Sequence, residues 1–332
     1  MRCSSIGRCA AILAAFVATL IFCGVPWAQA QTPTTVAANE QTVSIVVLQA
    51  EKLSGSGQTK AAVDLLNGYL AQHSSDVRAL VDRGDAYETL GDQRSAIADY
   101  TAALAVNPVY AYAYASRCQS RWEIDQNDLA LADCNKAIEL SPDMGYAFRQ
   151  RALVEIDLND LTSALHDADR AVALSPNDAY GLATRCHVYV ASGNSEAAVK
   201  DCTAAIGMND RMNTPYFYRG RAEIIAKDWA AAIADFSTVL RNDPNEMGAY
   251  YWRATARSNA AAYAVALDDV DRYLAVHPDD GDAHLLRARI ELGLGNRPAA
   301  KASATDALRH YRIDNDEAGA AKAQAMLDEL SG

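Results

Sequence analysis

The sequence predicts an all-α solenoid of eight helical hairpins followed by one capping helix. Three features that recur every 34 residues predict it. An alanine occupies the twentieth position of every hairpin, and a small residue occupies the eighth. Prolines mark five hairpin ends, and Asp210 fills the slot that is skipped between the third and the fourth of them: Pro108, Pro142, Pro176, Pro244 and Pro278. Small side chains in register let two helices approach closely, and alanine favours helix by itself.

Each unit is predicted to be two helices joined by a turn near its fifteenth residue. Glycine stands there in four units, and Asp125 and Asn159 tolerate the same left-handed backbone. Lys227 and Ala261 fit this turn less well. Proline at the end of a unit cannot continue the second helix. The eight units cover residues 43–314 without an insertion and begin at Val43, Val77, Ala111, Gly145, Ala179, Asn213, Met247 and Gly281.

This pattern resembles the tetratricopeptide repeat, a helix-turn-helix unit of 34 residues. The resemblance covers residues 43–314 and implies a right-handed superhelix, with the first helix of each unit on the concave surface. Residues 315–332 follow, with four apolar side chains at helical spacing: Ala323, Met326, Leu327 and Leu330. Because a solenoid leaves its last hydrophobic face open, we expect this segment to form a capping helix.

The chain begins with the layout of a secretory signal peptide. A basic start precedes an apolar run from Ala10 to Cys23, and Ala28-Gln29-Ala30 offers a small-x-small cleavage site. The run is too short to cross a membrane comfortably, and no later apolar segment is long enough. We therefore expect residues 1–30 to be cleaved off after Ala30 and the mature protein to be periplasmic or secreted. The alternative is retention as an uncleaved anchor. Residues 31–42 are polar and are expected to be a flexible leader.

The chain is acidic, with a formal net charge of −12 at pH 7. Such a domain repels phosphate backbones, which argues against nucleic acid and against anionic membrane surfaces. The sequence has no histidine ligand pair, phosphate loop or nucleophile motif, so we expect no cofactor, no metal and no enzymatic activity. The charged segment from His277 to His284 has a metal site as its alternative interpretation, but it lies at a junction where aspartate is expected as a helix cap.

The cysteines that follow the expected signal peptide occupy the eighth and twenty-fourth positions of two units: Cys118, Cys134, Cys186 and Cys202. Two other units have glycine opposite an aromatic ring at these positions: Gly84 with Tyr100, and Gly220 with Phe236. Residues that exchange volume in this way touch in a close-packed core. We therefore expect the disulfides Cys118–Cys134 and Cys186–Cys202. A four-cysteine metal site is disfavoured because a whole repeat separates the pairs, and a redox dithiol because no Cys-x-x-Cys motif occurs.

Arginine and aspartate form a second pair of repeating positions beside the cysteines. Arginine recurs at position seven, from Arg83 to Arg287, and aspartate at position twenty-three, from Asp99 to Asp269. The first unit lacks both partners together, which indicates an ion pair between the two helices of a unit. The last unit keeps Arg287 opposite Ser303. A row of arginines could instead bind phosphate or sulfate, but each guanidinium has a carboxylate to match its donors.

Positions two, five, nine and twelve of the first helices form a stripe that faces away from the second helices. The stripe supplies the candidate partner-binding residues Tyr112, Trp122, Tyr146, Arg149, Tyr180, His187, Phe217, Arg221, Tyr251 and Arg289. Aromatic rings with scattered arginines are typical of peptide-binding hot spots, and the basic residues favour an acidic or C-terminal segment. Packing between neighbouring repeats is the alternative role for each tyrosine. The Lys/Asn clamp that some family members use is absent, because Leu153 stands where asparagine is required.

The sequence therefore predicts a non-catalytic, exported repeat scaffold that binds a protein or peptide in its concave groove. Two alternatives remain open at this point. One is a permanent structural subunit of a cell-envelope assembly, and the other is an accessory to polysaccharide or peptidoglycan machinery.

Overall fold

The computed structural model describes residues 45–331, which form seventeen helices and no strand. The expected signal peptide and leader lie outside these residues. No helix within 45–331 is long and apolar enough to cross a membrane. The described chain divides into two compact units, which are the N-terminal unit, residues 45–177, and the C-terminal unit, residues 178–331.

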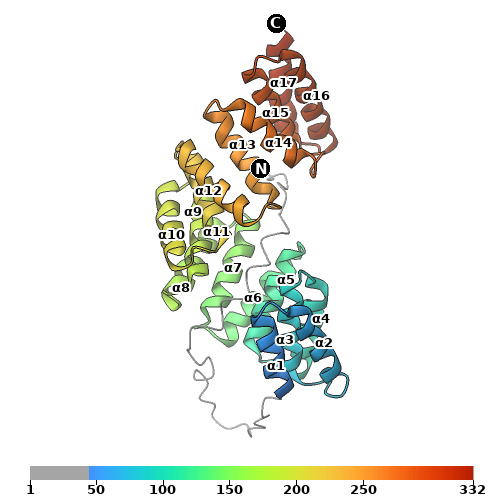
Figure 1. Cartoon of the computed structure of the whole chain (residues 1–332). Coiled ribbons are helices and arrows are strands. Elements are labelled where there is room, and N and C mark those ends of the chain that lie inside the picture. The colour runs from blue at the N-terminus through green and yellow to red at the C-terminus, as the bar shows by residue number, and fades with distance from the viewer. Residues whose placement is uncertain (1–44, 332) are drawn as a thin grey trace. The chain divides into compact units, whose positions relative to one another are not determined.

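The N-terminal unit consists of four helical hairpins (Figure 1, blue to green). Its helices are α1 (Ile45–Gly55), α2 (Thr59–Leu70), α3 (Val77–Thr89), α4 (Gln93–Val106), α5 (Ala111–Glu123), α6 (Asn127–Leu140), α7 (Gly145–Asp157) and α8 (Leu161–Leu174). The first helices contact one another in the order α1, α3, α5 and α7, whereas α2, α4, α6 and α8 make no such contacts with one another. The first helices are therefore closer together and form the concave side of this unit.

The C-terminal unit repeats this arrangement and adds one helix. Its helices are α9 (Ala179–Ala191), α10 (Ser195–Met208), α11 (Asn213–Ile225), α12 (Trp229–Asn242), α13 (Met247–Asn259), α14 (Tyr263–Leu274), α15 (Gly281–Gly293), α16 (Arg297–Ile313) and α17 (Glu317–Ser331). Here α9, α11, α13 and α15 form the concave layer. The final helix α17 packs Ala323 and Leu330 against α15 and α16, covering the apolar face of the last hairpin.

Every hairpin turn contains a residue in the left-handed region at the fifteenth position. Glycine takes it in four hairpins, and Asp125, Asn159, Lys227 and Ala261 take it in the others with φ between 57° and 64°. Lys227 and Ala261 are therefore forced into the same backbone as the glycines. The turn is held by hydrogen bonds such as Ala262 N to Arg257 O, 2.9 Å, which tie the end of the first helix to the start of the second.

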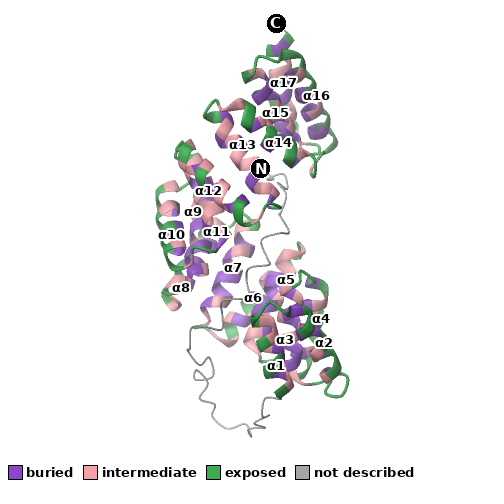
Figure 2. Cartoon of the chain, in the orientation of Figure 1, coloured by how far each residue is buried: buried purple, intermediate pink, exposed green. Residues whose placement is uncertain are grey.

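The hairpin cores are built on the eighth and twenty-fourth positions, which lie side by side. A Cβ added to Gly84 would stand 2.6 Å from Cε1 of the Tyr100 ring, and one added to Gly220 would stand 2.8 Å from Cζ of Phe236. The aromatic ring thus occupies the volume that a side chain on the first helix would need. Figure 2 shows the result, with buried positions on the packed faces of the helices and exposed positions gathered at the turns.

Candidate functional site

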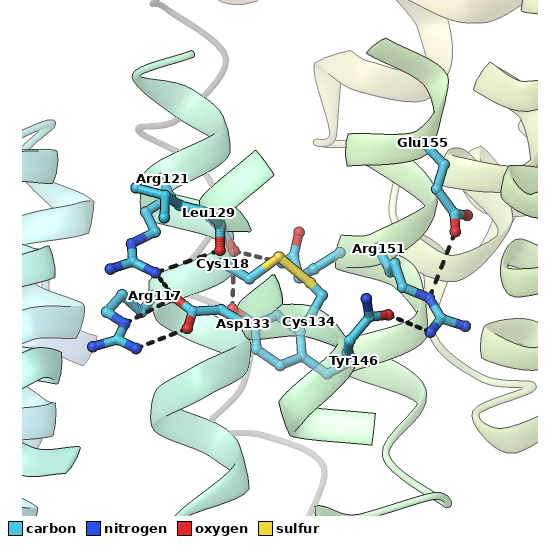
Figure 3. The surroundings of a disulfide bond; sticks show 12 residues. Arg117, Cys118, Arg121, Leu129, Asp133, Cys134, Tyr146, Arg151 and Glu155 are labelled. Carbon is cyan, nitrogen blue, oxygen red and sulfur yellow. Dashed lines mark hydrogen bonds and ion pairs between the residues drawn. A yellow bond between two sulfur atoms is a disulfide. The ribbon is translucent and has the colours of Figure 1, made fainter. Parts of the chain in front are cut away.

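The two disulfides and the charged residues beside them hold the hairpins together. Cys118 is bonded to Cys134 and Cys186 to Cys202, each with a Cα–Cα distance of 5.5 Å, which are the two pairs expected from their positions. Next to the first bridge, Arg117 donates to both oxygens of Asp133, with Nε–Oδ2 2.8 Å and Nη2–Oδ1 2.7 Å (Figure 3). Each bridge therefore lies beside an ion pair that joins the same two helices.

The arginine–aspartate pair recurs in six hairpins, as the sequence indicates. The pairs are Arg83–Asp99, Arg117–Asp133, Arg151–Asp167, Arg185–Asp201, Arg219–Asp235 and Arg253–Asp269, with N–O distances of 2.5 to 2.7 Å. In the last repeat, Arg287 instead pairs with Asp271 of the preceding hairpin, 2.8 Å.

The same guanidinium groups also reach the preceding hairpin, which the sequence reasoning missed. Nη1 of Arg83 donates to Oδ1 of Asn67 at 2.8 Å, and Nη1 of Arg117 donates to Oγ1 of Thr101 at 3.0 Å. The signal was present, because the twenty-fifth position of most units is a polar residue. Because these guanidinium groups donate to residues of their own hairpin and of the preceding one, the arginines link neighbouring repeats and do not form an anion site.

On the concave side of the N-terminal unit, the predicted residues make contacts between neighbouring hairpins. The rings of Tyr112 and Tyr146 stack with centroids 5.8 Å apart, and Arg149 lies over the Tyr146 ring at 5.0 Å. Trp122 donates its Nε1 proton to Oδ2 of Asp157 at 2.5 Å. Arg149 is only 7% exposed, so it differs from the ligand-facing arginine that its position predicts. The tyrosines thus serve as packing between repeats while remaining partly exposed.

The concave side of this unit also carries a group of carboxylates that the sequence reasoning passed over. They come from α1, α3 and α5, and we name them the acidic face: Glu51, Asp82, Asp85, Glu88 and Glu123. Arg78 forms ion pairs with Glu51 and with Asp82, the latter at 2.9 Å. Asp85 accepts hydrogen bonds from the hydroxyls of Tyr100 and Tyr112 at 2.7 and 3.1 Å.

Burial shifts the titration of these carboxyl groups. It raises the pKa of Asp82 to about 8 against the opposing effect of Arg78, and it raises the pKa of Asp85 to about 6. Burial also raises the pKa of Glu123 to about 8, and burial together with the nearby Asp85 raises the pKa of Glu88 well above its usual value. The face predicted to attract acidic segments is thus lined by carboxyl groups in the N-terminal unit, and burial favours their protonated forms.

The concave side of the C-terminal unit is aromatic and carries arginine. His187 stacks on Tyr218 with ring centroids 3.9 Å apart, and the guanidinium of Arg221 lies 4.9 Å from the Trp252 ring and 5.9 Å from the Tyr218 ring. The four side chains form a continuous row across α9, α11 and α13, which we name the aromatic row. Burial, and then the charge of Arg221, lower the pKa of His187 to about 3, so this imidazole is neutral at pH 7.

The remaining predicted residues of this unit lie around the aromatic row. Phe217 contacts the Phe236 ring edge-on at 5.7 Å, and Tyr251 lies 5.3 Å from the Tyr273 ring. Tyr180 is half-buried at the start of α9, and Arg289 is exposed on α15. Tyr218 and Trp252 were missed because they occupy the sixth position, one step outside the predicted stripe.

No group of three or more His, Cys, Asp or Glu side chains within residues 45–331 has the arrangement of a metal site. The charged segment at the last junction contains Asp280, whose carboxylate accepts from Ala283 N at 3.0 Å and caps α15. His284 stacks on His310 with the rings 5.2 Å apart and nearly parallel. These contacts are those of a helix junction.

Stacked helical hairpins with a concave layer of first helices define a helical-repeat protein of the solenoid class. A family model described as tetratricopeptide repeat matches residues 47–108, 81–145 and 185–247. The chain belongs to the tetratricopeptide repeat family. No curated protein sequence matches it.

Two solved structures illustrate the fold. The crystal structure of the APC/C hetero-tetramer Cut9–Hcn1 contains a chain that is similar with a TM-score of 0.72 and 13% identity over 89% of this chain. The match covers 57% of that protein, so this chain spans little more than half its length. A tetratricopeptide repeat protein from Parabacteroides merdae ATCC 43184 is similar with a TM-score of 0.53 and 16% identity, over 77% of this chain and 99% of that one. At such identities the likeness shows the shared fold alone.

Proposed function

We propose that this protein is a non-catalytic, exported scaffold that binds a partner protein or peptide across its concave first-helix layers. Tetratricopeptide repeats commonly act as protein-interaction scaffolds, and the fold supports this general role. The observation that carries the proposal is the aromatic row, His187, Tyr218, Arg221 and Trp252, which is only partly buried. Tryptophan, tyrosine and arginine side chains dominate binding energy at protein interfaces.

Export is supported by the signal-like start of the chain and by the two disulfides. Disulfides persist in the periplasm and outside the cell, whereas reducing systems remove them from most cytosolic proteins. Cell fractionation followed by N-terminal sequencing tests this part of the proposal. We expect a mature chain that begins at Gln31, and a full-length cytosolic chain with free thiols would contradict export.

Partner binding is tested by crosslinking in cells. A photo-reactive amino acid at Arg289, exposed on the concave layer, is expected to capture a partner that the same group at Lys301, exposed on α16, does not. The captured partner is then titrated against the Arg221→Ala/Trp252→Ala variant. We expect an affinity loss of at least about 1.4 kcal/mol, or tenfold.

The control for this titration is Arg312→Ala, which removes an exposed arginine near the end of α16. A folded double variant that binds its partner as tightly as the control would refute the concave-layer proposal. A partner that co-purifies at fixed stoichiometry in every preparation would instead favour a permanent envelope assembly.

A further inference from the structure

The acidic face of the N-terminal unit has more carboxyl groups than its own cations can pair. Arg78 is engaged by Glu51 and Asp82, so it is shared between two carboxylates at one end of the face. Asp85, Glu88 and Glu123 have no Lys or Arg within ion-pair distance among residues 45–331. An uncompensated carboxylate is costly to bury, so this arrangement requires a reason beyond packing.

These three carboxylates are hydrogen-bonded by neutral groups only. Tyr100 and Tyr112 donate to Asp85, and Ser120 donates to Oε1 of Glu88 at 2.5 Å. Burial raises the pKa of Glu123 to about 8 and that of Glu88 well above its usual value, which favours the protonated carboxyl in both until a cation lies beside it.

A second observation, independent of charge, lies at the other end of the face. Gln119 is fixed because its Nε2 donates to Oε1 of Glu123 at 3.1 Å while its Oε1 accepts from the Tyr146 hydroxyl at 2.9 Å. Gln150 must then turn its amino group toward Oε1 of Gln119, 2.5 Å away. Its own Oε1 is left without a donor although the residue is only 2% exposed. Oε2 of Glu123 is enclosed and lacks a donor as well.

An enclosed acceptor without a donor is uncommon in folded proteins and calls for a specific explanation. Here the two acceptors lie at the two ends of one hydrogen-bonded chain, which runs from Gln150 through Gln119 to Glu123. The enclosed acceptors need hydrogen-bond donors, and the carboxyl groups need a positive charge. A guanidinium or an ammonium group supplies both. The stacked rings of Tyr112 and Tyr146 add aromatic faces that attract cations.

We propose that the acidic face binds a basic segment of the partner protein and receives an arginine or lysine side chain among Asp85, Glu88 and Glu123. This inference rests on the proposed function, because it specifies what the concave layer of the N-terminal unit selects. Charge complementarity favours it further, since an acidic concave face steers basic partners toward itself and rejects acidic ones.

The test measures binding of labelled peptides to the full chain by fluorescence polarisation at about 0.15 M salt, where long-range surface attraction is screened. Three short peptides alternate alanine with arginine, lysine or glutamate. We expect the arginine and lysine peptides to bind and the glutamate peptide not to bind the acidic face. Asp85→Asn/Glu88→Gln keeps the shape and hydroxyl contacts of both side chains, and it is expected to weaken the basic peptides at least about tenfold.

A matched control removes the same charge elsewhere in the same unit. Asp64→Asn/Asp128→Asn changes two exposed carboxylates on α2 and α6, and binding is expected to stay within about twofold of the wild type. Because Glu88 is buried, the single variant Glu123→Gln on α5 gives a second measurement should the double variant unfold. We expect it to weaken binding several-fold.

The inference would be overturned if the wild type, the control and both acidic-face variants bound the arginine peptide equally well. The net charge of the protein alone would then explain the binding. If basic peptides do not bind while crosslinks from Arg289 still depend on Arg221 and Trp252, the inference fails and the proposed function stands. If those crosslinks are absent too, the proposed function fails with it.

Discussion

Replacing Gly84 by alanine is expected to destabilise the N-terminal unit. The added Cβ would lie 2.6 Å from Cε1 of Tyr100, and the Tyr100 side chain is fully buried, so the ring cannot swing into solvent. Either the ring or helix α3 must shift. Overpacking a filled core in this way costs about 1–3 kcal/mol.

Two further variants show whether this cost comes from the Gly84–Tyr100 contact. Gly68→Ala makes the same chemical change on α2, where an added Cβ meets nothing within 4 Å, and it is expected to stabilise by about 0.5–1 kcal/mol. Tyr100→Leu combined with Gly84→Ala reproduces the pair Ala50 and Leu66, which stands at the eighth and twenty-fourth positions of the first repeat. The double variant is expected to be at least about 1 kcal/mol more stable than the sum of the two single changes predicts.

Urea denaturation of the full chain, read by circular dichroism and by amide hydrogen exchange in α3 and α4, supplies the free energies of unfolding. The reasoning is refuted if Gly84→Ala is as stable as Gly68→Ala. It is equally refuted if the double-variant cycle is additive to within about 0.5 kcal/mol, since touching residues must couple.

Three other changes are expected to alter stability. Replacing Cys118 and Cys134 together by alanine, the pair found in the fourth repeat, should cost about 3 kcal/mol in urea denaturation, and an unchanged midpoint would mean that the bridge contributes nothing. Burial raises the pKa of Glu123 to about 8 in the folded chain, so its contribution to stability is complete below about pH 4.5 and is lost as pH rises through about 8. In thermal melts across that pH range, the melting temperature of Glu123→Gln should fall less with rising pH than that of the wild type. Ala261→Gly should stabilise the chain by about 1 kcal/mol, because alanine is held at φ 57°, whereas Gly295→Ala should destabilise it by a similar amount. If both variants had the urea midpoint of the wild type, the left-handed backbone would not affect stability.

Most of the fold could be predicted because the chain carries many copies of one unit. Comparing copies reveals which positions change together, and this comparison alone matches Gly84 with Tyr100 and Cys118 with Cys134. The contact of Arg83 with Asn67 was harder to find, since it joins two copies and asparagine, threonine and serine exchange freely at that position.

The candidate site was predicted less well, for two physical reasons. A helix presents a face wider than one stripe of side chains, so Tyr218 and Trp252 at the sixth position were left out. The sequence also does not mark Asp85 and Glu88 as part of the site, because their burial is set by neighbouring helices, which the sequence of one helix does not report. The division between the two units also leaves no trace, because the 34-residue period runs through it without a break.

The repeated arginines contact both their own hairpin and the preceding one, and this limits the changes in repeat length that the chain tolerates. Arg117 meets Asp133 sixteen residues ahead and Thr101 sixteen residues behind, so both distances along the chain are fixed at once. One extra residue in a helix turns everything beyond it by about 100° and would swing a partner out of range. A single insertion would therefore loosen a hairpin from its own second helix or from its neighbour. The contacts of the arginines therefore require that the repeats have the same length.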